Sequence, residues 1–335
     1  FSEPNDAGTN GQVGFCSNEV SSVTPFDLFG LLGGNPDTDG VWTGPTSTTN
    51  GHLGTVNVSS FTTAGSPYIF SYTVSSSPNC QPVTSTVTID VLPLPTATVT
   101  ANPALTCENE TTTLTFTGTP NSVVTYNING GTNQTITIPA SGTINTNIVV
   151  TANTVITIVS VASSGTPSCI NPQSSTITIT VLPLPTATVT ANPALTCENE
   201  TATLTFTGTP NSVVTYNING GSNQTITIPA SGTINTNIVV TANTVITIVS
   251  VASSGTPSCI NPQSSTITIT VLPLPTATVT ANPALTCENE TTTLTFTGTP
   301  NSVVTYNING GTNQTITIPA SGTINTNIVV TANTV

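Results

Sequence analysis

Between residues 111 and 138 the chain reads TTTLTFTGTPNSVVTYNINGGTNQTITI. Threonine, valine and isoleucine dominate 111–117, 122–128 and 134–138, and most of these runs alternate with the period of a β-strand that buries one face. Asn129, Gly130 and Gly131 separate two of the runs, and these residue types accept the positive φ angles of a tight hairpin turn. Residues 118–121 have the composition of a second turn. The stretch predicts antiparallel β-structure.

The same composition continues on both sides of this stretch. Further strands are expected at 96–100, 143–150, 155–161 and 175–181, with another turn at 139–142. Nothing in the stretch has helical periodicity. Seven strands in about 90 residues predict an all-β module, an immunoglobulin-like β-sandwich.

This module is repeated almost letter for letter. Residues 91–180 and 181–270 differ only where Thr112 becomes Ala202 and Thr132 becomes Ser222, and residues 271–335 repeat 91–155 without a change. Such repetition is typical of a tandem array in which each copy adds length. We expect repeats at 92–181 and 182–271 and a truncated third at 272–335, in a chain that reads as a segment of a longer protein.

A short proline-rich motif stands before each repeat. Leu92-Pro93-Leu94-Pro95 recurs at 182–185 and 272–275. Alternating prolines favour extended polyproline II geometry, which predicts a stiff connector between modules. Each module would then add on the order of 40 Å.

Residues 1–91 form a module of a distinct type, also immunoglobulin-like. Strands are expected at 12–15, 41–43, 53–58, 67–74 and 84–91. Trp42, the one tryptophan, lies between two cysteines in the sequence, as does the core tryptophan of immunoglobulin domains. Burial in the core is the favoured interpretation, and stacking on a ligand is the alternative.

The charge composition excludes several classes of partner. The 335 residues contain no lysine or arginine, 13 acidic residues and one histidine, for a net charge of -13. Without cations the chain cannot neutralise phosphates, which argues against nucleic acid and anionic membrane as partners. No apolar stretch approaches the roughly 20 residues of a membrane helix. We therefore expect no direct membrane insertion.

Seven cysteines are spaced in pairs, one pair to each complete module. No Cys-x-x-Cys or Cys/His cluster suggests a metal site, so the spacing predicts structural disulfides and an oxidising, extracellular location. The expected pairs are Cys16 with Cys80, Cys107 with Cys169, and Cys197 with Cys259, which leaves Cys287 without a partner.

The acidic residues are the other candidates for a site. Glu108 and Glu110 follow the first cysteine of a repeat, and Asp37 and Asp39 lie in a turn-like segment. Carboxylates can bind calcium, but that ion takes six to eight oxygen ligands, so solvated turns are the favoured interpretation and no cofactor is expected. His52 is isolated, no catalytic triad can be built in the repeats, and the chain is not expected to be an enzyme.

Several motifs carry a family resemblance. In the repeat they are Leu105-Thr106-Cys107-Glu108-Asn109-Glu110, Val124-Thr125-Tyr126-Asn127-Ile128-Asn129-Gly130-Gly131 and Gly165-Thr166-Pro167-Ser168-Cys169, and in the first module Gly40-Val41-Trp42 and Gly65-Ser66-Pro67-Tyr68. The repeats and the first module resemble those of SprB-like gliding-motility adhesins. These are very large cell-surface proteins of Bacteroidota exported by the type 9 secretion system.

The resemblance implies a structural shaft that extends a binding region from the cell for surface attachment or gliding. Its partners would be extracellular surfaces, polysaccharide or other cell-surface proteins. Two alternatives stay open. The outward threonines Thr111, Thr113, Thr115 and Thr117 suggest a polysaccharide- or ice-binding surface, and the truncated third repeat suggests self-association into a filament by strand donation.

Overall fold

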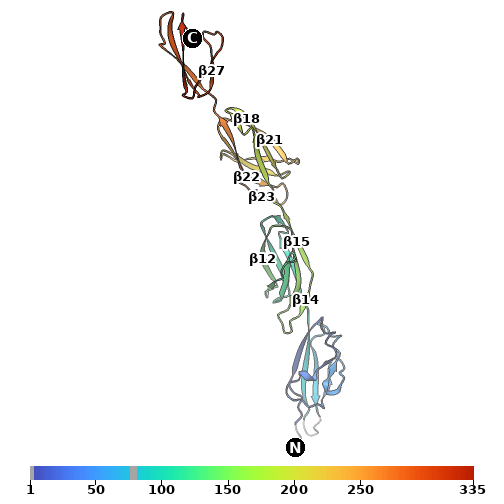
Figure 1. The fold of residues 1–335 in the computed structure, drawn as a ribbon. Helices are drawn as coiled ribbons and strands as arrows, with labels where there is room; N and C mark the ends of the chain where they lie inside the picture. The colour runs from blue at the N-terminus through green and yellow to red at the C-terminus, as the bar shows by residue number, and fades with distance from the viewer. Residues whose placement is uncertain (1–3, 76–80) are drawn as a thin grey trace. The chain divides into compact units, whose positions relative to one another are not determined.

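The computed structural model describes residues 4–75 and 81–335. Its regular elements are β-strands and two short 3-10 turns (Figure 1). The chain divides into two compact units, Phe1–Leu184 and Pro185–Val335, and each is described by itself. The division falls inside the second Leu-Pro-Leu-Pro motif.

The described residues of the first module form two sheets. One has the strand order β1-β6-β5-β3, with β1 parallel to β6, and the other pairs β2 with β4. The strands are β1 Gly11–Cys16, β2 Phe26–Asp27, β3 Val41–Thr43, β4 Thr55–Val56, β5 Tyr68–Val74 and β6 Val83–Leu92, and the 3-10 turns are η1 Phe29–Leu31 and η2 Gly51–Leu53. The strand expected at 53–58 is observed only as β4, and the first of the expected residues belongs to η2.

Trp42 lies in the core of the first module, as the favoured interpretation predicted. Its side chain is 7% exposed and packs beside Tyr72, with ring centroids 4.8 Å apart. The indole Nε1 donates a hydrogen bond of 2.8 Å to the backbone oxygen of His52. This bond satisfies the polar atom of an otherwise apolar ring.

The first repeat is a two-sheet sandwich. One sheet has the order β11-β10-β13-β15-β8, with β14 paired to β13, and the other has the order β12-β9-β7. The strands are β7 Ala97–Asn102, β8 Leu105–Cys107, β9 Glu110–Gly118, β10 Val123–Ile128, β11 Gln134–Thr137, β12 Thr143–Val150, β13 Thr154–Ala162, β14 Ile170–Pro172 and β15 Thr176–Leu182. All seven expected strands are present, and β8 and β14 are additional.

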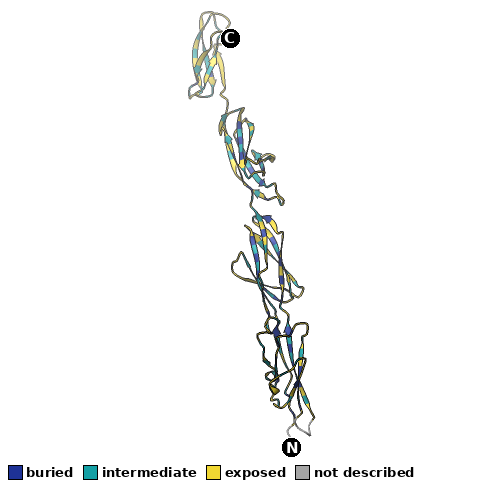
Figure 2. Ribbon diagram, turned by 90° about the vertical axis from the view of Figure 1, so that its right-hand side faces the viewer, coloured by how far each residue is buried: buried dark blue, intermediate teal, exposed yellow. Residues whose placement is uncertain are grey.

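Alternation along the strands builds the core of the repeat. Leu114 and Phe116 on β9 and Ile156 and Ile158 on β13 belong to one apolar cluster, and all four side chains are fully buried. Figure 2 shows buried and exposed residues alternating along the strands. Each such side chain contributes about 1.5–3 kcal/mol through removal of apolar surface from water. The fold is the all-β, immunoglobulin-like sandwich that the sequence predicts.

The second unit has the same architecture. Its second repeat contains β16 Ala187–Asn192, β17 Leu195–Cys197, β18 Glu200–Gly208, β19 Val213–Ile218, β20 Gln224–Thr227, β21 Thr233–Val240, β22 Thr244–Ala252, β23 Ile260–Pro262 and β24 Thr266–Leu272. The residues that follow form β25 Ala277–Asn282, β26 Glu290–Gly298, β27 Val303–Tyr306, β28 Gln314–Thr317 and β29 Thr323–Val330. The registers repeat those of the first repeat, as expected for nearly identical sequences.

Candidate functional site: the junction between the first module and the first repeat

A cysteine lies beside the connector at one end of the first module. Because β1 runs parallel to β6, Cys16 lies opposite Leu92, the last residue of β6. The backbone nitrogen of Ser17 donates a hydrogen bond of 2.9 Å to the oxygen of Leu92. We call this end of a module, where its last strand meets the following connector, the exit end.

The connector is held at its other end by the first repeat. The side-chain nitrogen of Asn171, on β14, donates a hydrogen bond of 2.8 Å to the backbone oxygen of Pro95. Asn261 makes the same bond, 2.9 Å long, to Pro185 in the second repeat. Since proline already fixes its own φ, one bond at each end leaves the connector few free torsions. We call the end of a module that meets the preceding connector the entry end.

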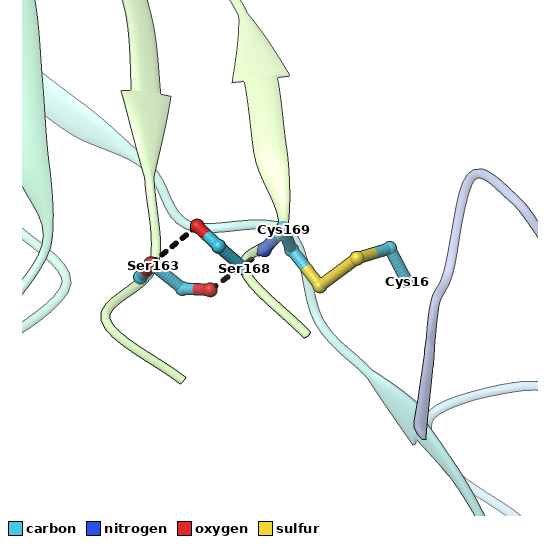
Figure 3. Close-up of a disulfide and its surroundings, with 4 residues drawn as sticks. All are labelled: Cys16, Ser163, Ser168 and Cys169. Carbon is cyan, nitrogen blue, oxygen red and sulfur yellow. Dashed lines mark hydrogen bonds between the residues drawn. A yellow bond between two sulfur atoms is a disulfide. The ribbon is translucent and has the colours of Figure 1, made fainter. Parts of the chain in front are cut away.

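A short loop at the entry end presents the second cysteine. The hydroxyl of Ser168 donates to the backbone oxygen of Ser163 at 2.7 Å, and the nitrogen of Cys169 donates to the hydroxyl of Ser163 at 2.9 Å (Figure 3). The loop is closed further by a backbone bond from Ser163 to Cys169. These bonds fix the direction of the Cys169 side chain.

The two cysteines form a disulfide that joins the modules. Cys16 is bonded to Cys169, with their Cα atoms 5.4 Å apart and a sequence separation of 153 residues (Figure 3). Both residues are buried. A close contact accompanies the bond, because a Cβ atom added to Gly14 on β1 would stand only 2.9 Å from Cδ of Pro167. The two modules are thus linked twice, by the connector and by the disulfide.

This bond overturns the expected pairing within modules. Cys16 does not pair with Cys80, which lies outside the described residues, and Cys169 does not pair with Cys107. The pair Cys197 with Cys259 is also wrong, since Cys197 is a free, exposed thiol.

The geometry of the sandwich explains the error. Cys107 lies opposite Leu182 at the exit end of its repeat, whereas Cys169 follows β13 at the entry end. β13 spans nine residues between these ends, a distance of about 25 Å in a strand. Bridged cysteines have Cα atoms less than about 7 Å apart. The two cysteines of one module therefore cannot meet.

The second repeat reproduces both halves of the junction. Cys197 lies opposite Leu272, as Cys16 lies opposite Leu92. The loop before Cys259 has the same hydrogen bonds to Ser253 as the loop before Cys169 has to Ser163. Cys107 and Cys259 are disulfide-bonded, and Cys197 and Cys287 are the free cysteines of the described residues.

The glutamates that follow the first cysteine do not converge. Glu108 borders a shallow depression with Asn153 and Pro183, whereas Glu110 lies on β9 opposite Val150. In the parts of the chain that the structure describes, no three histidine, cysteine or acidic side chains come together in a way that could hold a metal ion.

The other acidic candidates belong to a turn that Tyr72 holds. A carboxylate oxygen of Asp37 accepts a hydrogen bond of 2.9 Å from the backbone nitrogen of Asp6. The Tyr72 hydroxyl donates to the backbone oxygen of Asp37 at 2.6 Å and accepts from the nitrogen of Gly40 at 2.9 Å. Burial, and then the nearby carboxylates of Asp39 and Asp37, raise the pKa of Tyr72, against the lowering effect of the Gly40 bond. Asp37 thus has a structural part in this turn.

The remaining candidates have neighbours within the fold. His52 packs edge-on against Phe29, with ring centroids 5.0 Å apart. On the outer face of β9, the hydroxyl of Thr113 donates to the side-chain oxygen of Asn147 at 2.9 Å. The hydroxyls of Thr117 and Thr143 lie 3.3 Å apart. Some of the threonine hydroxyls of this face therefore form hydrogen bonds with side chains of the neighbouring strand β12.

Two properties bear on where the protein works. Disulfide-bonded cysteines are typical of oxidising compartments, so the protein is non-cytoplasmic. None of the described residues belongs to a helix long and apolar enough to cross a membrane.

Comparisons with known proteins give only distant structural likeness. No protein-family profile matches the chain, and no curated protein matches it. A marsupial T cell receptor aligns at 10% identity with a TM-score of 0.33, covering 70% of this chain and 100% of the receptor. A mutant of Salmonella alpha-2-macroglobulin aligns at 10% identity with a TM-score of 0.23, covering 78% of this chain and 22% of the macroglobulin. The D0-D1 domain of intimin aligns at 16% identity with a TM-score of 0.20, covering 52% of this chain and 100% of that domain. The chain therefore spans about a fifth of the macroglobulin's length, and no functional conclusion follows from these scores.

Proposed function

We propose that this chain is part of the shaft of a large cell-surface adhesin of the SprB-like kind. In such a protein the modules hold a distal binding region away from the cell and transmit tension from it. The observation that carries the proposal is the Cys16–Cys169 disulfide, which joins consecutive modules in addition to the peptide connector.

A second covalent link between modules suits a protein that bears tension. Modules joined by one peptide segment can swivel about its backbone torsions, as flexible linkers do. Here the hydrogen bond from Asn171 to Pro95 and the disulfide both restrict that rotation. The orientation of the first module relative to the first repeat is then restricted.

The composition limits the partners of such a shaft. With no lysine or arginine and a net charge of -13, the surface repels anionic membranes and other copies of itself. Export by the type 9 secretion system, and participation in surface attachment or gliding, follow from the resemblance of the modules and belong to the same proposal.

Cells that make the whole protein provide the test. Antibodies against the first module should label intact, unpermeabilised cells. In-frame deletion of residues 91–180 should bring that label closer to the cell and leave adhesion to a surface measurable. Label that appears only after permeabilisation would refute the cell-surface location. Complete loss of adhesion in the deletion strain, with the shortened protein still displayed, would favour binding by the repeats themselves.

The threonine-rich face and the filament stay alternative predictions. Retention of the purified chain on a polysaccharide or ice column, lost when Thr113 and Thr115 are changed to valine, would establish the first. Polymerisation that depends on chain concentration would establish the second.

A further inference from the structure

The smaller sheet of each repeat ends in a strand with one unpaired side. β12, β21 and β29 lie at the ends of the strand orders β12-β9-β7, β16-β18-β21 and β25-β26-β29. All three strands have the same eight residues, TINTNIVV. We propose that this unpaired side, which we call the open edge, pairs with the open edge of a second copy of the chain, so that two chains associate side by side through a continuous sheet. This inference goes beyond the proposed shaft function and does not rest on it.

The backbone of β12 presents hydrogen-bonding groups along the open edge. One position before β12 begins, the nitrogen of Gly118 donates a hydrogen bond of 3.0 Å to the oxygen of Gly142. Opposed residues of an antiparallel pair alternate between bonded and unbonded, so the even-numbered residues of β12 bond to β9. The odd-numbered residues direct their N–H and C=O groups outward, and these are Thr143, Asn145, Asn147 and Val149. Within the described residues, these outward groups have one hydrogen bond, a long one of 3.4 Å from the hydroxyl of Ser141 to the oxygen of Thr143.

The sequence of β12 does nothing to block the open edge. Natural sheets discourage pairing at their edges with proline, lysine, bulges or inward-pointing charges. β12 contains no proline and no charged residue, and its register with β9 runs without a shift, unlike that of β10 with β13. β21 and β29 pair with their neighbours in the same regular way. Such an edge is suited to accept another strand.

The open edge is complementary to itself. Two copies of β12 related by a two-fold axis at Thr146 run antiparallel, as in an isologous dimer. Thr143 is then opposite the partner's Val149, and Asn145 is opposite the partner's Asn147. Every opposed pair of outward residues can exchange two backbone hydrogen bonds, for about eight in total. A shift by one residue would set outward groups against groups that are already bonded to β9, so the register is specified.

The side chains also fit this register. Ile144 would lie beside the partner's Ile148, and both isoleucines are only partly buried where they pack against the core of the repeat. Val149, which is 64% exposed, would lie beside the partner's Thr143. The equivalent valines of the other repeats, Val239 and Val329, are 64% and 62% exposed. Pairing therefore removes apolar surface from water as well as adding hydrogen bonds.

The acidic residues favour the antiparallel direction. The net charge of -13 opposes association in general, but the first repeat has two acidic residues, Glu108 and Glu110, and neither is on β12. Glu110 lies opposite Val150, at one end of β12. In the antiparallel pair the two Glu110 residues stand at opposite ends, roughly 25 Å apart at about 3.3 Å per residue. This separation exceeds the Debye length of about 8 Å at physiological salt, whereas parallel pairing would bring the two carboxylates together.

Sedimentation of the purified full chain over a range of concentrations tests the association. We expect dimers to form as the concentration rises. Asn145→Asp with Asn147→Asp keeps the shape of both side chains and sets like charges directly opposite each other across the open edge. Made in every repeat, this edge variant should raise the dissociation constant by about tenfold or more. The equivalent positions are Asn235 and Asn237 in the second repeat and Asn325 and Asn327 in the third.

A matched control adds the same charge elsewhere. Asn133→Asp with Asn153→Asp changes two exposed residues outside β12, and the equivalent residues of the other repeats are Asn223, Asn243, Asn313 and Asn333. This variant should associate far more strongly than the edge variant. A chain that stays monomeric at every accessible concentration would overturn the proposal. Equal weakening by the two variants would also overturn it, because total charge and not the open edge would then govern association.

Cross-linking tests the register. In a background with Cys197→Ser and Cys287→Ser, which removes the free thiols, Thr146→Cys in every repeat places a cysteine on the two-fold axis. The two Cα atoms would lie about 4.5 Å apart, within reach of a disulfide, so mild oxidation should link two chains. Thr143→Cys would stand about 20 Å from its equivalent in the partner and should not link. A link through Thr143→Cys, or none through Thr146→Cys, would contradict the proposed register.

The same measurements separate this inference from the other proposals. Strand donation would complete the third repeat with a strand from another copy and does not use the outward groups of β12. Association that persists unchanged in the edge variant would therefore overturn edge pairing and favour donation. Surface labelling of cells does not depend on association, so a protein that is displayed on the surface and remains monomeric would leave the shaft proposal intact.

Discussion

Gly14 offers a direct test of how the junction is packed. It lies on β1 opposite Asp90, and an added Cβ would stand 2.9 Å from Cδ of Pro167 and 3.5 Å from Cδ1 of Leu92. The proline ring cannot rotate away as a flexible side chain can. Gly14→Ala should therefore push the loop that carries Cys169 away from β1 and weaken the disulfide without breaking either sandwich.

The size of the effect follows from the cost of overpacking. Forcing an extra methyl group into a packed contact typically costs about 1–3 kcal/mol. If that cost is relieved when the bond opens, the reduction potential of the disulfide rises, because 30 mV corresponds to about 1.4 kcal/mol for a two-electron couple. We expect a rise of about 20–60 mV, or roughly a 5- to 150-fold shift in the equilibrium towards the thiols.

Redox titration in glutathione buffers, read out by mass spectrometry of the Cys16 and Cys169 peptides, measures this shift. Gly30→Ala is a matched control, since nothing lies within 4 Å of a Cβ added to Gly30, and its midpoint should equal that of the unaltered chain. An unchanged midpoint for Gly14→Ala would refute the proposed contact between β1 and the loop.

Three further predictions concern the modules themselves. Tyr72→Phe removes two hydrogen bonds and should destabilise the first module by about 1–3 kcal/mol, seen as a lower midpoint in the fluorescence of Trp42. Because burial raises the pKa of Tyr72, the folded module keeps its proton more tightly than the unfolded one. Stability should therefore fall as the pH rises above about 10, and the Phe variant should lack that loss. Asn129→Ala should cost about 1–2 kcal/mol, since Asn129 has φ 52° and its side-chain oxygen accepts a bond of 2.7 Å from the nitrogen of Val155. Hydrogen exchange at Val155 measures this, and Asn129→Gly, which tolerates the φ angle, should cost less. Finally, millimolar calcium should leave the melting temperature of the full chain unchanged relative to chelator, whereas ion at about 100 times its Kd would add about 2.7 kcal/mol.

The sequence was sufficient where local chemistry decides the structure. Alternation in 111–117 and 143–150 predicts two strands that lie within β9 and β12 of one sheet. The Asn129 turn was found because few residue types accept its backbone conformation. Burial of Trp42 followed from the general preference of large aromatic residues for the interior. Each of these predictions depends on residues within a few positions of one another, or on one side chain alone.

The short strands and the disulfide could not be found in this way. β8 and β14 have three residues each, too few to show a period. Their pairing, parallel to β15 for β8 and antiparallel to β13 for β14, is what places Cys107 and Cys169 at opposite ends of one module. The cysteine spacing fits pairing within a module as well as pairing across a junction. Only the pairing of β8 and β14 shows at which end of the module each cysteine lies, and so distinguishes the two.

The absence of cations explains why a junction of this kind is useful. Consecutive modules of many proteins are held by ion pairs and apolar contacts, but here no lysine or arginine exists to pair with the 13 acidic residues. Fixed orientation at the junction therefore comes from apolar packing, such as that of Pro167 beside Gly14, from neutral hydrogen bonds, such as that from Asn171 to Pro95, and from the disulfide. A hydrogen bond contributes about 1 kcal/mol and reforms quickly after it opens, so it cannot resist a sustained pull. A covalent disulfide stays closed under a pull that opens hydrogen bonds, and because it carries no charge it is insensitive to ionic strength.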